Sequence, residues 1–490
     1  MMRPLLDRIE ALSILQPHHV ALSEPRRSIS YGELPHLIRD LSAELGALKI
    51  SRLAIYGDNT IDWALIDLAA MSSNIVVVPI PLFFSNAQIQ HLCQASNVDA
   101  IFADRPFPIS MGKEISATTL EGHFIKMSVS SQIPDAMART SAAGNKITFT
   151  SGSTGDPKGA CLGADTLLTI TSSLASALTS SELGPHLCLL PFSTLLENVA
   201  GIYLPLWMGR KLCIDSPTHL GLQSNHQFNA SVFCQQVQAT GAESVILLPQ
   251  MLKDIIETGD TTALRALKFI AVGGGKVAPD LLRRAQKAGL RVYEGYGLTE
   301  CGSCVALNTP EASRLGSVGK PLPHAQVRIA DDGEIWVTGA AMQGYLSDQI
   351  VLTEIATGDA GHLDNDGFLY VTGRIKNVLV SSFGRNISPE WVEGQLLSVP
   401  EIEQAIVFGE AQPHLSAVLV VDDAINDQQL NLLLREVNSG LPDYARVVSW
   451  TRTSQRFCVE DGTMTETGKP RRDLIASRYE ALSRQQGVAA

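Results

Sequence analysis

Cysteine is scarce in this sequence: eight cysteines are spread through 490 residues with no repeated spacing that would mark a disulfide framework. Cys301 and Cys304 form a single CxxC pair, but no second pair and no histidines at zinc-ligand spacing follow it. We therefore interpret both as ordinary reduced, buried thiols. Long apolar runs are also lacking, because the longest, residues 75–84, contains two prolines and is too short to span a bilayer.

Basic charge is in deficit, with 38 Lys and Arg against 50 Asp and Glu and a net charge of −12. This balance argues against general binding to nucleic acids or anionic membranes, although it permits an anionic ligand in a locally basic pocket. Residues 1–16 contain four charges and no apolar run of signal-peptide length. We expect a soluble cytoplasmic protein with no transmembrane segment and no nucleic-acid partner, and the sequence leaves its oligomeric state open.

Hydrophobic residues make up 45% of the chain and charged residues 18%, a composition that supports a sizeable folded core. Short apolar runs alternate with amphipathic stretches, which predicts an α/β fold. The predicted strands are residues 52–57, 74–79, 243–248 and 268–272, and residues 62–71 form a predicted helix.

Beyond about residue 310 the pattern changes to short strands of alternating character, separated by Asp-Gly turns at 332–333 and 366–367. A βαβ-like tail of the size of a small domain follows Arg374. We therefore expect two domains, residues 1–375 and residues 376–490. The predicted elements of this region are strands 326–329, 333–337, 367–371, 377–380, 404–409 and 416–421 and helices 389–398 and 427–439.

The segment Thr148–Gly159 has the most distinctive local composition, with five hydroxyl residues and three glycines in twelve positions. Hydroxyl donors, close-approach amides and the cation of Lys158 suit a polyphosphate. The segment is not a Walker A loop, because Gly159 stands where that motif has Ser or Thr. A flexible linker is the alternative, but the strand-like residues 146–149 that precede it disfavour a linker.

Residues 269–278 offer a second glycine-rich motif, a strand that runs into G-x-G-x-x-A. By itself this segment is compatible with a dinucleotide-binding turn or with a plain tight turn between strand and helix. The following loop, residues 293–300, combines aromatic rings, two glycines, a threonine and a glutamate. Such a set can stack on adenine, donate to a phosphate and hold Mg²⁺.

Two further segments carry charged residues. Residues 357–374 form a predicted acidic hairpin flanked by Asp359 and Arg374, and a carboxylate that accepts both ribose hydroxyls would explain Asp359. Residues 465–472 are basic, and an exposed tail is the default interpretation of such a run.

These four segments, in this order, resemble the adenylate-forming superfamily of acyl-CoA synthetases, peptide-synthetase adenylation domains and luciferases. The resemblance covers nearly the whole chain. It implies a large N-terminal adenylate-forming domain, built from two α/β subdomains and a small β-barrel-like subdomain, and a small mobile α+β C-terminal domain. Other segments similar to the family are residues 29–39, 316–323, 333–339, 373–377 and 384–393.

The resemblance also implies a role for individual residues and replaces the dinucleotide interpretation. Lys469 would bridge the attacking carboxylate and the α-phosphate, Thr299 would bind that phosphate, and Glu300 would coordinate Mg²⁺. Asp359 would hold the ribose and Arg374 the ribose or a phosphate. The remaining implied roles are phosphate binding by Thr150, Ser151, Gly152, Ser153, Thr154, Gly155 and Lys158; adenine binding by Gly273, Gly274, Gly275, Tyr296 and Gly297; the hinge at Lys376; the thiol loop of Phe383, Gly384 and Arg385; and the substrate pocket of Phe192, Thr194 and Leu195.

The sequence departs from the family pattern at several positions. Many members have a histidine where Thr194 stands, Phe383 replaces a common glycine, and Lys276 ends a Gly-Gly-Gly-Lys run in place of Gly-Gly-Ala. The hinge pair Lys376-Asn377 stands where Lys-Asp or Asp-Asp is frequent.

Residues 188–196 contain no Asp to hold an amino group, so we expect an acid with an apolar tail, because an unpaired buried ammonium is costly. A medium- or long-chain fatty acid fits best, and an aryl acid is the alternative. Candidate tail-lining residues are Leu195, Leu196, Val199, Ile246, Leu247, Leu248 and Met251.

The expected cofactors are ATP, Mg²⁺ and coenzyme A. The phosphopantetheine of an acyl carrier protein is the alternative thiol, and a chain without an extra segment near the hinge favours coenzyme A. A catalytically idle binding protein on the same fold is a further alternative. The presence of both Glu300 and Lys469 argues against it.

Overall fold

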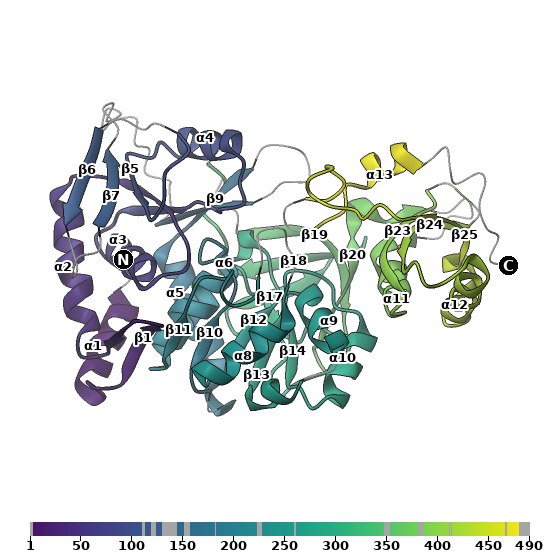
Figure 1. Cartoon of the computed structure of the whole chain (residues 1–490), viewed down its shortest axis with the longest axis horizontal. Helices are drawn as coiled ribbons and strands as arrows, with labels where there is room; N and C mark the ends of the chain where they lie inside the picture. The colour runs from purple at the N-terminus through teal and green to yellow at the C-terminus, as the bar shows by residue number, and fades with distance from the viewer. Residues whose placement is uncertain are drawn as a thin grey trace.

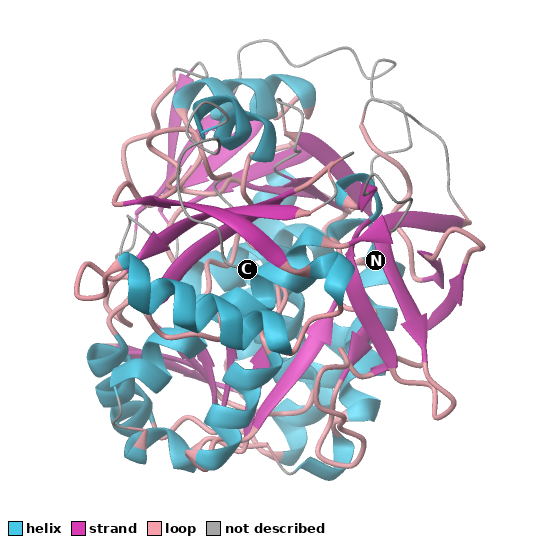
Figure 2. Ribbon diagram, turned by 90° about the vertical axis from the view of Figure 1, so that its right-hand side faces the viewer, coloured by secondary structure: helices cyan, strands magenta, loops and turns pink. Residues whose placement is uncertain are grey.

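The elements gather into a large N-terminal body and a smaller C-terminal part beside it, at the right of Figure 1. Figure 2 looks onto the C-terminal part, which stands in front of the body. No helix in the described part of the chain is both long and apolar enough to cross a membrane. This computed structural model describes residues 3–109, 113–118, 124–129, 145–150, 157–181, 183–222, 228–258, 261–346, 353–380, 386–410, 412, 414–465 and 468–479.

A nine-stranded sheet forms the lower part of the N-terminal body in Figure 1, with strand order β16-β15-β14-β13-β12-β10-β11-β1-β2. Its central strands, from β14 to β1, pair in parallel, and the two ends of the sheet are antiparallel. The strands are β1 Val20–Glu24, β2 Arg27–Ser30, β10 His186–Cys188, β11 Leu212–Ile214, β12 Ser244–Leu247, β13 Phe269–Val272, β14 Val292–Tyr296, β15 Ala306–Leu307 and β16 Lys320–Pro321.

A seven-stranded sheet lies beside it, in the order β6-β7-β5-β3-β4-β8-β9. Strands β5, β3, β4 and β8 pair in parallel, and β8 and β9 form an antiparallel hairpin around the segment rich in hydroxyl residues. The strands are β3 Arg52–Tyr56, β4 Val76–Pro79, β5 Ala100–Ala103, β6 Lys113–Thr118, β7 Phe124–Val129, β8 Lys146–Thr150 and β9 Lys158–Leu162.

The helices cover the faces of these sheets, and one of them is central to the core. Helix α3 buries ten of its twelve residues, as expected for a helix that is apolar on all sides. It begins at Thr60, whose hydroxyl accepts a hydrogen bond from the Trp63 amide at 3.0 Å. The helices of the body are α1 Arg3–Leu15, α2 Leu34–Ala47, α3 Ile61–Ser72, α4 Asn86–Ala95, α5 Ala164–Ala177, α6 Leu195–Glu197, α7 Leu204–Trp207, α8 Ala230–Thr240, α9 Pro249–Thr258 and α10 Pro279–Lys287.

A four-stranded antiparallel meander follows, at the position of the expected small β subdomain, and no pairing closes β17 onto β20 among its described residues. Both predicted Asp-Gly turns are present, since Gly333 and Gly367 have φ of 87° and 80°, which favour glycine. The strands are β17 Ala325–Ile329, β18 Glu334–Gly339, β19 Glu354–Leu363 and β20 Leu369–Arg374.

The C-terminal part has apolar clusters of its own, formed entirely by residues 379–479. The predicted helix 427–439 is confirmed residue for residue as α12, whereas β25, which pairs in parallel with β24, was not predicted. The division into domains at 375 and 376 stays a prediction. The elements are β21 Leu379–Val380, β22 Asn386–Ile387, α11 Pro389–Leu396, β23 Ile402–Phe408, β24 Leu415–Val421, α12 Asp427–Ser439, β25 Val447–Thr453 and α13 Arg472–Tyr479.

A buried ion pair links the two sheets of the body. The Lys146 ammonium, at the start of β8, donates to Asp67 Oδ1 at 2.7 Å, to Asn198 Oδ1 at 2.5 Å and to the Tyr203 hydroxyl at 2.7 Å. Tyr203 and Asn198 in turn donate to Asp67 Oδ2. Lys146 and Asp67 are 0% exposed, so all of their stabilisation comes from these partners. The cluster joins β8 to α3 and to a π-helical segment, η3 (Asn198–Tyr203).

We expect Lys146→Met to lower the free energy of unfolding by about 3–5 kcal/mol, because it leaves the Asp67 carboxylate buried without its cation. Urea unfolding followed by circular dichroism measures the change. Lys287→Met, at an exposed lysine in the last turn of α10, is the matched control and should alter stability by less than about 0.5 kcal/mol. Equal stability of Lys146→Met and the natural protein would contradict the role of the cluster.

Candidate active site

A cleft of about 1680 Å³ opens at the carboxyl ends of the parallel strands of the nine-stranded sheet. Ligands of open α/β sheets bind at these strand ends. The C-terminal part contributes Thr465 and Gly468 to the opposite wall. The cleft is thus bounded by both parts of the chain. Of the residues predicted from sequence for the site, those that line it are Thr194, Leu195, Gly273, Gly274, Tyr296, Gly297 and Thr299.

Two of these positions require glycine for different reasons. Gly274, in the turn that follows β13, has φ of 79°, a left-handed conformation that glycine adopts without strain. Gly297 is packed so closely that a Cβ would lie 1.8 Å from the Ser303 carbonyl oxygen. A side chain at either position would therefore disturb the backbone at the strand ends that line the cleft. Gly275, also predicted for the site, faces Pro249 and is not among the residues that line the cleft.

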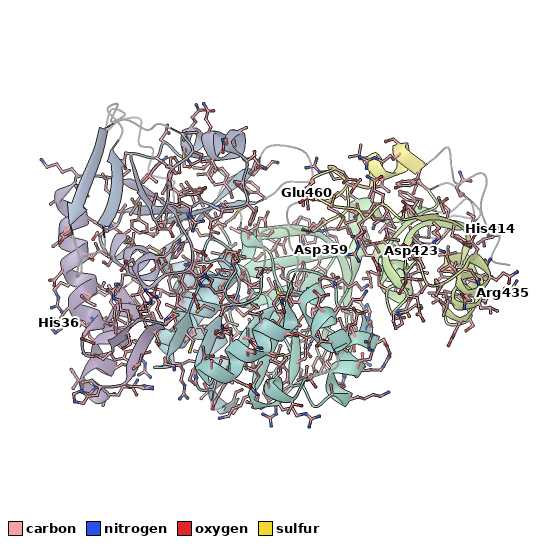
Figure 3. The ribbon with its side chains drawn as sticks, in the orientation of Figure 1. His36, Asp359, His414, Asp423, Arg435 and Glu460 are labelled. Atoms are coloured by element: carbon pink, nitrogen blue, oxygen red, sulfur yellow. The ribbon has the colours of Figure 1, made fainter. Side chains whose placement is uncertain are left out.

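The predicted ribose-binding pair is assembled by β-sheet register. Asp359 and Arg374 stand opposite each other on β19 and β20, with Arg374 Nε 2.8 Å from Asp359 Oδ1. The Tyr296 hydroxyl donates to Asp359 Oδ2 at 2.6 Å. Burial raises the pKa of Asp359, and the Arg374 guanidinium opposes that shift. Figure 3 shows Asp359 at the junction of the body and the C-terminal part, with Glu460 of that part above it.

Tyr345 is a site residue that the sequence interpretation missed. Its hydroxyl donates to Glu300 Oε1 at 2.6 Å, and the Lys158 ammonium lies 5.7 Å from the centre of its ring. Tyr345 reaches this position because its backbone forms an antiparallel bridge with Ala160 of β9. Tyr345 thus connects the metal-binding candidate to the phosphate hairpin. The Gly344-Tyr345 dipeptide after a strand was the available signal.

Lys469 reaches the same region from the C-terminal part. Its loop is held by the Lys469 amide, which donates to Thr465 Oγ1 at 3.0 Å. Lys469 is solvent-exposed by surface area, but the protein around it removes part of the hydration of its ammonium and so lowers its pKa. The Arg374 cation lowers this pKa further, whereas Asp359 and Glu300 raise it. The lysine ammonium is therefore within electrostatic range of both acidic residues of the site.

Several predicted residues stand apart from this arrangement. Ser151, Gly152, Ser153, Thr154 and Gly155, and likewise Phe383, Gly384 and Arg385, fall outside the described residues, as does the side chain of Thr150. Lys376 lies in a short 3₁₀ turn, η6 (Ile375–Asn377), directly after β20.

The Phe192 ring does not line the cleft. It is 1% exposed and packs 5.3 Å from the Trp63 ring, centre to centre. Asn59, which the sequence interpretation missed, fixes the backbone here: its side chain accepts from the Phe192 amide at 2.8 Å and donates to the Leu190 carbonyl at 2.8 Å. Phe192 is therefore a core residue, and it anchors the segment that leads to Thr194 and Leu195. The thiols of Cys301 and Cys304 are free and buried, as expected.

The fold, with a cleft at the sheet ends that both parts of the chain line, is that of an adenylate-forming enzyme. The chain belongs to the AMP-binding enzyme family, whose model matches residues 14–346. The resemblance inferred from the motifs is thereby confirmed, and with it the α/β fold. The family and the curated relatives make the chain an acid–thiol ligase.

Curated relatives match most of the chain. It is 26% identical to the long-chain-fatty-acid–CoA ligase FadD15 of Mycobacterium bovis, over 89% of this chain and 88% of the relative. It is 24% identical to the 2-succinylbenzoate–CoA ligase of Listeria monocytogenes, over 95% and 97%. The o-succinylbenzoate CoA synthetase of Bacillus subtilis has a similar fold, with a TM-score of 0.76 at 22% identity, over 96% of this chain and 97% of that one. That synthetase has been solved with its acyl adenylate and with ATP and magnesium.

Glu294 is a buried acid on β14, two residues before Tyr296. It is 6% exposed, its Oε1 lies 3.4 Å from the Val277 amide, and its Oε2 has no hydrogen-bond partner among the described residues. Burial raises the pKa of Glu294 to about 8 from an ordinary value of 4.5. The carboxyl is therefore neutral in the folded protein at neutral pH.

This shift predicts a pH-dependent stability. Between the two pKa values the folded state binds a proton that the unfolded chain releases, so the free energy of unfolding falls as pH rises from about 4.5 to about 8. The slope reaches about 1.4 kcal/mol per pH unit. Urea unfolding across this range should show a flatter profile for Glu294→Gln, which is neutral throughout. Glu436→Gln, at an exposed glutamate of α12, should keep the natural slope, and a slope equal in all three proteins would contradict the prediction.

Proposed function

We propose that the protein activates an apolar carboxylic acid with ATP and then transfers the acyl group to coenzyme A. In the first step, a carboxylate oxygen attacks the α-phosphorus of ATP, the bond from that phosphorus to the β-phosphate bridging oxygen breaks, and pyrophosphate leaves. In the second step, the thiol sulfur attacks the acyl carbonyl, AMP leaves, and the thiol proton passes to solvent. ATP, Mg²⁺ and coenzyme A are the cofactors.

The observation that carries this proposal is the bonded group of Tyr296, Asp359 and Arg374, beside a cleft that both parts of the chain line. Both reactants of the first step are anions, so their approach needs positive charge at the α-phosphate. From the C-terminal part, the Lys469 ammonium is within electrostatic range of Asp359 and Glu300. Asp359 and Arg374 would hold the ribose, Tyr296, which donates to Asp359, would contact adenine, and Thr299 would donate to the α-phosphate. These contacts position the reactants, and Lys469 stabilises the charge that develops.

The residues around Glu300 fit a magnesium ion. The Tyr345 hydroxyl occupies one lone pair of the Glu300 carboxylate, and a carboxylate has several more for a hard cation. When bound, Mg²⁺ supplies charge that neutralises phosphate oxygens. Tyr345 orients the carboxylate, and Lys158, beside the tyrosine ring, adds a cation at the same place.

The wall of the cleft supports an acid with a tail. Residues that line the cleft stand along β12 and β13 from their first residues to just beyond their last, so a channel runs along these strands back from the strand ends. From Phe269 to Gly273 this channel is about 13 Å long, at about 3.3 Å per residue. Leu174 of α5 and Leu178, directly after this helix, also line it. These wall residues are Ser244, Val245 and Ile246 on β12 with Leu248 just beyond it, and Phe269, Ala271 and Val272 on β13 with Gly273 and Gly274 just beyond it.

Five of the seven candidate tail residues line the cleft, whereas Val199 and Leu247 do not. A fatty acid and an aryl acid both fit such a channel, as the names of the relatives illustrate.

The acceptor thiol is coenzyme A in this proposal, and the phosphopantetheine of an acyl carrier protein is the alternative. The turn containing Lys376 would be the hinge about which residues 376–490 rotate between the two steps.

The decisive experiment is a pyrophosphate-exchange assay over a panel of carboxylic acids, followed by thioester detection with and without coenzyme A. Acid-dependent exchange is expected, and thioester should form only when coenzyme A is present. An absence of exchange with every acid would contradict the proposed function and favour an idle binding protein.

Lys469→Ala should lower adenylate formation by about two to three orders of magnitude, because the charge that forms at the α-phosphate loses its cation. Transfer from a supplied acyl adenylate to coenzyme A should fall far less, since that step does not need this lysine. Rapid-quench measurement separates the two steps. Arg471→Ala, at an exposed arginine two residues away, should leave both rates unchanged. Equal damage to both steps in Lys469→Ala would refute the assignment.

Glu300→Gln should raise the Mg²⁺ concentration needed for half-maximal exchange by at least about tenfold, because a neutral amide binds a hard cation weakly. The amide oxygen still accepts from Tyr345, so the melting temperature should remain within about 2 °C. Exchange measured across a magnesium titration, with Glu436→Gln as the control, tests this role. An unchanged magnesium requirement would show that Glu300 serves only to anchor Tyr345.

A further inference from the structure

The end of the channel farthest from the nucleotide is polar. His186 and Ser244 start β10 and β12, stand opposite each other in parallel register, and both line the cleft. His186 Nδ1 lies 3.0 Å from Ser244 Oγ. Both residues are more than nine-tenths buried, so neither is simply a solvated surface group. A channel that served a purely apolar tail would end in apolar side chains, because buried polar groups are costly there.

A carboxyl group stands behind His186. Glu197 is 0% exposed, its Oε1 lies 3.4 Å from His186 Nε2, and its Oε2 has no hydrogen-bond partner among the described residues. Gly201 makes room for it, since a Cβ there would lie 2.5 Å from Glu197 Oε1. The three side chains form a relay in the order Glu197, His186 and Ser244. Its last hydroxyl faces the channel.

We propose that this relay binds a hydroxyl group at the far end of the substrate, so that the enzyme prefers hydroxylated carboxylic acids over their unsubstituted counterparts. The inference rests on the proposed function and narrows its substrate class. Leu174, Leu178 and Ile246 line the channel between the two ends and would contact the apolar part of the chain. The Ser244 hydroxyl would be the specificity-determining group.

Hydrogen-bond chemistry selects a hydroxyl over other polar groups. Both ring nitrogens of His186 are engaged, so the ligand meets Ser244 Oγ. If the imidazole accepts from Ser244, the serine oxygen can only accept from the ligand, and if the imidazole donates, the serine hydroxyl can donate. A hydroxyl complements both states, whereas a ketone complements one. A second carboxylate would face the Glu197 carboxyl in a buried site.

A bound metal is the other possible use of these side chains. Donor atoms of His186, Cys188 and Glu197 lie within 4.8 Å of one another. The Cys188 thiol, however, lies 3.6 Å from the Gly201 carbonyl as a donor, and burial raises its pKa well above the ordinary value. Metal ligation requires the thiolate, so this environment opposes a metal. The relay therefore serves hydrogen bonding.

The test compares pairs of acids of increasing length, each with and without a terminal hydroxyl, in the pyrophosphate-release assay. The natural protein should show a kcat/KM at least about tenfold higher for the hydroxylated member at the best length. Ser244→Ala should lower this ratio by about 10- to 100-fold, because the ligand hydroxyl loses its partner. Ser231→Ala, at a serine that lines the cleft from α8, is the matched control and should keep the ratio.

Three results would overturn the inference. Equal kcat/KM for both members of every pair would refute the hydroxyl preference while leaving the proposed function intact. A preference for dicarboxylic acids, added as a third arm, would replace the relay with Arg210, which lines the same cleft and whose Nε has no hydrogen-bond partner among the described residues. A ratio unchanged in Ser244→Ala would show that another group binds the hydroxyl. Failure of every acid to release pyrophosphate would remove the proposed function itself.

Discussion

The buried cluster around Lys146 is the interaction on which the arrangement of the site depends. In this cluster the Lys146 ammonium is fully buried. It joins β8, which leads into the β8–β9 hairpin, to helix α3 and to the π-helical segment η3. A buried cation is tolerated only when every donor is matched, so the three elements have one relative position in which the cluster is satisfied. The positions of the phosphate-binding hairpin and of the channel are therefore coupled. A π-helical turn at this point agrees with the frequent occurrence of such turns at functional sites.

The chemistry is divided between the two parts of the chain. The body supplies recognition: β-sheet register sets Asp359 against Arg374, the end of β14 presents Tyr296, and Tyr345 holds Glu300. The C-terminal part supplies the Lys469 cation. In the proposed rotation of residues 376–490, a charge needed for only one step lies on the part that moves. The loop that bears Lys469 is held by local hydrogen bonds to Thr465, so its conformation depends on contacts within the C-terminal part.

The channel combines two kinds of surface. Its walls are largely aliphatic, in agreement with an apolar tail, but its far end carries a buried glutamate, a histidine and a serine. The sequence interpretation selected only apolar candidates, around Thr194 and at residues 246–251, and so missed the polar end. The polar residues come from the starts of two strands and from a helix, and the spacing between them along the chain has no regular period. Only the parallel pairing of β10 with β12 brings His186 and Ser244 together.

The sequence alone determined the family, the α/β class and most strand positions, because these depend on short segments whose local composition carries the signal. Helix 427–439 and the two Asp-Gly turns followed from local patterns in the same way. The tertiary structure alone decided that Tyr345 contacts Glu300, that Asn59 holds the backbone of Phe192, and that Lys146 joins the two sheets. Each of these contacts joins residues 45 to 133 positions apart, and the side chains involved give no local signal of their partners. Such pairs form only when strand order and packing bring them into contact, which no short pattern encodes.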